Sequence, residues 1–283
     1  MKRRFWLSIL AAVLIIASIG SYFLLGAPGL STPTGEPAEP TGVHTSATVP
    51  LPNPYLSHFF LGARDKGDSR KLLGKVMLTF FLVSDSESRW DAGSIDALRR
   101  THEKATERMN AEAERYGVTL EVIRKYIPCT ISSSMSRANY SYETCIVPAL
   151  AAAGFSDPSK VSAALEKQFD VDDAAIIFCV NQAGGSFARM SYVPTGFEFA
   201  VVYGSRTDYR HELYHMYGAM DLYLGSVKAF AQSYLPTSVM LHASLGMMDG
   251  LTAYLIGWTD TLSAKATAFL EATKHISGSN YGY

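Results

Sequence analysis

Short apolar runs alternate with longer amphipathic stretches along the chain from about residue 75 onward. Short runs rich in apolar and β-branched residues predict buried strands, whereas apolar residues spaced three and four apart predict helices packed through one stripe. Strands are expected at 75–83, 118–127, 174–180, 186–193 and 197–203, and helices at 91–116 and 158–169. Gly117 is placed to end the first helix, because glycine accepts the left-handed conformation found at helix C-termini.

The order strand, helix, strand, helix, strands predicts an α/β fold in which a helix packs beneath a sheet. The strand at 186–193 is more polar than the others, so it is expected at an edge of the sheet. An extended peptide can add to such an edge as a further strand. The alternative is that this segment is only a solvated hairpin arm. The segment that follows residue 127, with Cys129 and Cys145, is expected to be a loop.

The first residues have a different character. Residues 5–25 are apolar apart from Ser, Gly and one Tyr, and three basic residues precede them. This pattern predicts a membrane anchor over 1–26 with the rest of the chain outside the cytoplasm, at a cell surface or in a periplasm. A cleaved signal peptide, with a cleavage site near Ser18 and Gly20, is the alternative, and the protein would then be secreted. Residues 27–54 hold seven of the twelve prolines and form a linker, which leaves 55–283 as one domain.

Charge and cysteines add two expectations. The net charge is -1 and no basic stripe is present, so no nucleic-acid partner is expected. Outside the cytoplasm, Cys129 and Cys145 could close a short loop as a disulfide. Free thiols agree with the sequence equally well. Cys179 lies within an apolar run and is expected to be a buried thiol.

The strongest chemical signal is the stretch from His211 to Asp221, which reads H-E-x-x-H-x-x-G-x-x-D. Residues four apart share a helix face, so His211 and His215 can bind one ion. Gly218 is expected to end the helix, and the turn would bring Asp221 round as a third ligand. Three protein ligands leave a fourth position for water, which is the arrangement of a catalytic zinc site.

Glu212 lies beside the first ligand and is the expected general base, since it can reach a metal-bound water. Zinc would lower the pKa of that water and polarise a scissile carbonyl. Three alternatives remain. The histidines could be incidental residues of a core helix, the metal could only brace a membrane-anchored binding or assembly module, or the centre could serve a non-peptidase hydrolase of the cell envelope.

The motif resembles that of the metzincin zinc peptidases, in which the third ligand lies beyond a glycine turn. The run Asp221-Leu222-Tyr223 is also similar to secreted bacterial peptidases of the immune-inhibitor kind. The resemblance implies an endopeptidase that holds Zn2+ and binds peptide or protein substrates along a sheet edge. It implies a twisted, mainly parallel sheet with an antiparallel edge strand, a backing helix and an active-site helix, then a mostly helical C-terminal part.

Ser238-Val239-Met240 resembles the methionine-containing turn of the serralysin and astacin groups. Met240 would then form an apolar floor beneath the ligands, with a helix following at 248–258; Met247 and Met248 are alternatives for this methionine. Two departures from the family matter. Asp221 stands where most metzincins have histidine, although the snapalysin type has aspartate there. His242 stands where astacins and serralysins have tyrosine, and it is either a hydrogen-bond donor to the oxyanion or a solvated loop residue.

Overall fold

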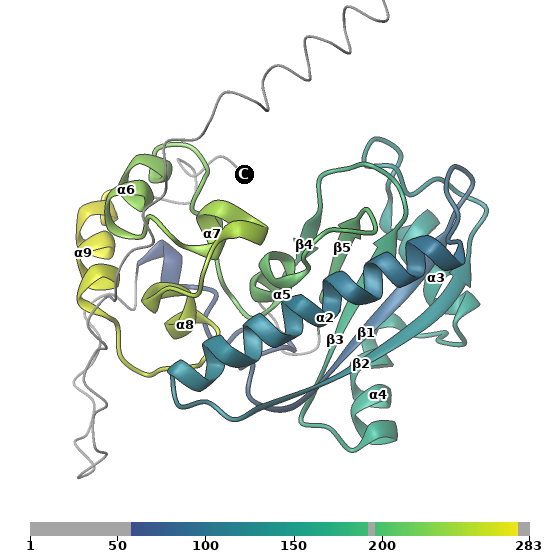
Figure 1. Cartoon of the computed structure of the whole chain (residues 1–283), viewed down its shortest axis with the longest axis horizontal. Helices are drawn as coiled ribbons and strands as arrows, with labels where there is room; N and C mark the ends of the chain where they lie inside the picture. Colours follow the sequence, from purple (N-terminus) through teal and green to yellow (C-terminus); the bar gives the residue numbers. More distant parts are fainter. Residues whose placement is uncertain (1–57, 192–195, 277–283) are drawn as a thin grey trace, which may run out of the picture. The chain divides into compact units, whose positions relative to one another are not determined.

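One five-stranded sheet organises the chain in the computed structural model, which describes residues 58–191 and 196–276 (Figure 1). The strand order is β2-β1-β3-β5-β4. The strands are β1 (Gly74–Ser84), β2 (Leu120–Thr130), β3 (Asp173–Val180), β4 (Phe187–Arg189) and β5 (Phe199–Tyr203). All neighbours pair in parallel except β4, which is antiparallel to β5 and forms one edge. The predicted α/β class, the five strands and the edge position of the polar strand are confirmed.

The sheet is buried on both faces. On β1, Leu78 and Phe80 pack with the long helix α2 (Ala92–Arg115) and the C-terminal helices. The alternate residues Met77 and Phe81 pack with α3 (Val147–Ala152) and α4 (Val161–Phe169) on the opposite face. A strand covered on both sides has apolar residues at successive positions, which explains the continuous apolar run that predicted β1.

Local signals set the limits of α2. The Asp91 side chain accepts a hydrogen bond from the Ser94 backbone, and the Ser94 side chain accepts one from Asp91 in return. This reciprocal cap satisfies two backbone N–H groups that a helix start leaves without partners. Gly117 follows the helix with a φ of +68°, as expected for a glycine at a helix C-terminus.

The segment that contains Cys145 corrects one expectation. Residues 142–152 are not a loop: a π-helical turn η3 (Tyr142–Ile146) runs directly into α3. Its buried residues recur with helical spacing and pack against the sheet. Cys129 and Cys145 are both buried free thiols rather than a disulfide, and Cys179 is a buried thiol as predicted. The Cys145 thiol instead contacts the Ser134 carbonyl at 3.3 Å.

Beyond β5 the described chain is mostly helical, as the family resemblance implies. The elements are α5 (Arg210–Met216), α6 (Val227–Tyr234), α7 (Val239–His242), η5 (Ala243–Leu245), α8 (Gly250–Leu255) and α9 (Ala264–Thr273). Two short 3-10 turns lie earlier, η2 (Phe59–Leu61) and η4 (Pro158–Lys160). α8 occupies the centre of the helix expected at 248–258.

The described residues belong to one compact unit that spans Pro52–Tyr283. Within residues 58–191 and 196–276, no helix combines the length and apolarity needed to cross a bilayer. The anchor predicted over 1–26 and the linker predicted over 27–54 lie outside the described residues.

Candidate metal centre

Helix α5 carries the first part of the motif, and it lies against β4 and β5. It stops before Gly218, which has a φ of +96°. A Cβ at this position would lie 2.8 Å from the Ala63 carbonyl oxygen. Both the left-handed conformation and the close approach therefore require glycine. This is the turn that the sequence predicted, and it sends the chain back toward α5.

The turn brings the three predicted ligands together. Asp221 Oδ1 lies 3.0 Å from His211 Nε2 and 3.1 Å from His215 Nε2, and the two Nε2 atoms are 3.2 Å apart. A tetrahedral zinc with bonds of about 2.0–2.2 Å holds its ligand atoms roughly 3.3–3.5 Å from one another. The donor set and its spacing therefore fit a zinc ion with a shift of only a few tenths of an ångström.

Two backbone carbonyls orient the imidazoles. His211 Nδ1 donates to the Val239 carbonyl oxygen at 2.9 Å, and His215 Nδ1 donates to that of Ala219 at 2.8 Å. A carbonyl only accepts, so each Nδ1 carries a proton and each Nε2 is directed at Asp221. In neutral rings these Nε2 lone pairs face a carboxylate oxygen, which is unfavourable unless a proton or a metal cation lies between them.

The electrostatics of the cluster agree with this requirement. Burial opposes the protonation of His215, but the hydrogen bond and charge of Asp221 outweigh it, so the pKa of His215 is raised. Burial alone would raise the pKa of Asp221, yet the hydrogen bonds from His211 and His215 lower it. Both shifts arise because His215 and Asp221 each stabilise the charged form of the other.

Glu212 lies next to this cluster. Burial raises the pKa of its carboxyl, and the charges of His215 and His211 oppose that rise. Glu212 and the three candidate ligands each retain 5–7% exposure, whereas their neighbours Leu213 and Tyr214 are fully buried. All four polar side chains are therefore buried, and each keeps a small exposed fraction.

The segment that resembles a methionine turn packs directly against the centre. Ser238 caps α7, and its hydroxyl donates to Asp249 at 2.6 Å. The Met240 carbonyl accepts from the Leu222 backbone at 2.9 Å, immediately after Asp221. Met240 itself is buried in the same apolar cluster as the residues of α5. The place of this segment beside the ligands is thus established, while the role of Met240 as a floor beneath a metal stays a prediction.

Two aromatic residues near the motif, His242 and Tyr223, have different surroundings. His242 is exposed, as expected for a solvated residue, but it is the last residue of α7 and does not lie in a loop. Its Nε2 donates to the Pro236 carbonyl oxygen at 2.8 Å. Tyr223 was not expected to be a site residue. Its ring stacks with that of His211, with centroids 5.9 Å apart and planes at 29°, and it is 42% exposed. The sequence could have indicated that Tyr223 lies near the candidate site, because it follows Asp221 by only two residues.

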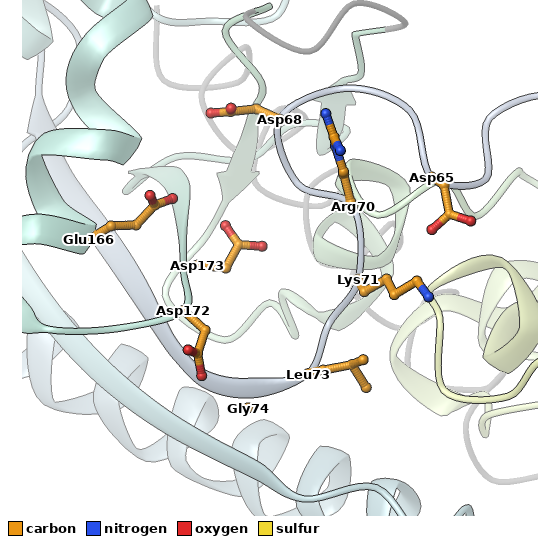
Figure 2. A pocket seen from close by; sticks show the side chains of 9 residues that line it. All are labelled: Asp65, Asp68, Arg70, Lys71, Leu73, Gly74, Glu166, Asp172 and Asp173. Carbon is orange, nitrogen blue, oxygen red and sulfur yellow. The ribbon is translucent and has the colours of Figure 1, made fainter.

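A large pocket lies away from the motif. It has a volume of about 740 Å³ and lies where β1 and β3 begin, and Figure 2 shows acidic side chains from several segments around it. Its lining residues are Asp65, Asp68, Arg70, Lys71, Leu73, Gly74, Glu166, Asp172 and Asp173. In the described part of the chain, side chains with the spacing of metal ligands come together at His211, His215 and Asp221. They do not do so among the described residues of this pocket.

Comparisons of the chain with models of protein families, with curated proteins and with solved structures found no match.

Proposed function

We propose that residues 55–283 form a metzincin-like zinc endopeptidase that acts outside the cytoplasm, anchored to a membrane through residues 1–26. The observation that carries this proposal is the convergence of His211 Nε2, His215 Nε2 and Asp221 Oδ1 within 3.0–3.2 Å. Glu212 follows His211 on the same helix and, like the three candidate ligands, is buried with a small exposed fraction. Two imidazoles and one carboxylate are the ligand set of catalytic zinc sites, which keep a further position for water.

Each side chain has a chemical role in this proposal. His211, His215 and Asp221 hold the ion, with the two imidazoles oriented by the carbonyls of Val239 and Ala219. The bound ion supplies a Lewis acid and a water of lowered pKa. Glu212 would take a proton from the attacking water and would then donate it to the leaving amine nitrogen.

The substrate would lie along β4. This strand is the last of the sheet, is only three residues long and contacts α5. Among the described residues no strand pairs with its outer side, so its backbone can pair with an extended peptide. An extended peptide on β4 would run beside the helix that carries Glu212, which favours a peptide over a compact substrate.

The test compares zinc content and peptide cleavage in the wild type and three variants. The wild type is expected to bind one zinc per chain and to lose cleavage when a chelator removes it. Glu212→Gln should keep the zinc and reduce turnover by about 10²–10⁴-fold, because only the base is lost. Asp221→Asn should bind zinc more weakly, because an amide oxygen is a poorer ligand than a carboxylate. The control His242→Ala should retain both zinc and turnover.

Other outcomes favour the other functions. A wild type without zinc would contradict the proposal and leave the histidines as residues of a core helix. Tightly bound zinc without hydrolysis would indicate a structural metal in a binding or assembly module. Cleavage of non-peptide amides or esters alone would indicate a different hydrolase.

A further inference from the structure

A buried charged network joins α2 to the beginning of the metal-site helix. Arg210 precedes His211 and is fully buried, and Glu112 on α2 is 4% exposed. Arg210 Nη1 lies 3.1 Å from Glu112 Oε2, and Arg210 Nη2 lies 2.9 Å from Asp208 Oδ2. The guanidinium is therefore held from two sides at the residue next to a candidate ligand.

The second oxygen of Glu112 reaches the other side of the centre. Glu112 Oε1 accepts from the Met248 backbone at 3.0 Å. The preceding residue, Met247, pairs through its backbone with Thr237 at 2.7 Å and with Val239 at 2.8 Å. The Val239 carbonyl is the group that orients His211. One carboxylate thus connects the two chain segments between which the His211 imidazole is held.

Stability does not account for this arrangement. Removing two or three charges from water costs several kcal/mol per ion, and apolar replacements of buried ion pairs often leave a fold equally stable. The geometry of the network instead limits the positions open to its partners, since each oxygen of Glu112 accepts from a different segment. A fixed partner behind a metal-ligating histidine commonly contributes to metal affinity.

We propose that Glu112 is a positioning residue of the metal centre, which sets the place of His211 through Arg210 on one side and through Met248 and Val239 on the other. The proposal rests on the proposed function for its catalytic consequence. Its consequence for zinc affinity can be measured without any activity.

The experiment uses the full chain and the variants Glu112→Gln and Glu112→Ala. The matched control is Glu114→Gln, the same change at an exposed position of α2. Zinc affinity is measured by competition with a chelator, and the visible spectrum of the Co²⁺-substituted protein reports ligand geometry. Both Glu112 variants are expected to bind zinc about 10–100-fold more weakly, with an altered Co²⁺ spectrum. Their kcat should fall more than KM rises, and the control should match the wild type.

The outcomes separate positioning from a merely structural role. Glu112 variants that unfold at lower temperature but keep the wild-type zinc affinity and Co²⁺ spectrum would overturn the inference. If Glu112→Ala does not fold, Glu112→Gln and Arg210→Lys decide: weaker zinc binding in both supports it, and unchanged binding overturns it. A wild type that binds zinc without hydrolysing peptides would defeat the proposed function, while an affinity loss in Glu112→Gln would still support the positioning role. A wild type without zinc would overturn both.

Discussion

At the scale of single residues, two backbone carbonyls set the chemistry of the candidate site. The carbonyl oxygens of Val239 and Ala219 accept hydrogen bonds from the Nδ1–H groups of His211 and His215. Each imidazole is thereby held in the tautomer that directs Nε2 at Asp221. A rotation of either peptide plane would remove this constraint, although every ligand would still be present. The presence of the candidate ligands and the orientation that would let them bind a metal are therefore separate properties of the chain.

The cysteines give a prediction at the same scale. Burial raises the pKa of the Cys129 thiol to about 12 and also raises that of Cys179, so little thiolate forms at neutral pH. We expect the buried thiols to react with an aromatic disulfide reagent at least about 100-fold more slowly in the native protein than after unfolding. Unfolding without reductant should release three reactive thiols per chain, as the free cysteines require. A single reactive thiol would show instead that two of the three cysteines form a disulfide, and peptide mapping would then test the Cys129–Cys145 bridge that the sequence also allowed.

At the scale of elements, a short helix and the turn after it create the ligand cluster. α5 spans only seven residues, all of them buried, and it packs against the sheet. A helix this short is not stable by itself, so tertiary packing must maintain it. The turn at Gly218 then reverses the chain within hydrogen-bond distance of the helix it has just left. The third ligand thus depends on a backbone conformation as much as on the carboxylate of Asp221.

Gly218→Ala tests that dependence. An alanine would have to adopt a φ near +96° and would clash with the Ala63 carbonyl oxygen. We expect the variant to lose on the order of 2 kcal/mol of unfolding free energy and to bind zinc more weakly, because Asp221 is displaced.

The matched control is Gly117→Ala, which has a φ of +68° but no atom within 4 Å of the added Cβ. It should cost on the order of 1 kcal/mol and leave zinc affinity unchanged. Denaturant unfolding and chelator competition measure the two effects. Equal zinc affinity in Gly218→Ala and the wild type would show that the turn does not place the third ligand.

At the scale of the whole molecule, buried acidic groups connect distant segments. Glu198 lies directly before β5. Its carboxylate accepts hydrogen bonds from the backbone N–H groups of Asp68, Ser69 and Ser191. It therefore joins the segment before β1 to the β4–β5 hairpin. Burial raises the pKa of Glu198 to about 7, against the opposing effect of these N–H groups. Burial likewise raises the pKa of Asp173 to about 7 at the start of β3.

These shifts predict how stability depends on pH. Between the unfolded pKa of about 4.5 and the folded pKa of about 7, the folded chain holds more protons than the unfolded chain. Unfolding free energy should therefore fall as pH rises through this window, by on the order of 1–3 kcal/mol per group. Glu198→Gln should reduce the slope and leave the part due to Asp173. Urea unfolding from pH 4.5 to 8 measures this dependence of unfolding free energy on pH, with the exposed Glu121→Gln as control. An unchanged slope in Glu198→Gln would show that Glu198 does not contribute to it.

The sequence alone determined the features that local patterns encode. The five strands, the limits of α2 and the cluster of His211, His215 and Asp221 were predictable, because side-chain periodicity, caps and helix spacing are properties of neighbouring residues. The helical segment over 142–152 was missed because it is short and contains Pro148, a residue that favours only the first turn of a helix.

Only the tertiary structure decided the rest. The acceptor for His211 lies 28 residues along the chain, and Glu112 lies 98 residues from Arg210. His242 ends α7 and donates to the Pro236 carbonyl before that helix, while Tyr223 comes to lie against His211 through the turn at Gly218. Contacts between distant segments form only when the sheet and helices pack, so no local pattern in the sequence encodes them.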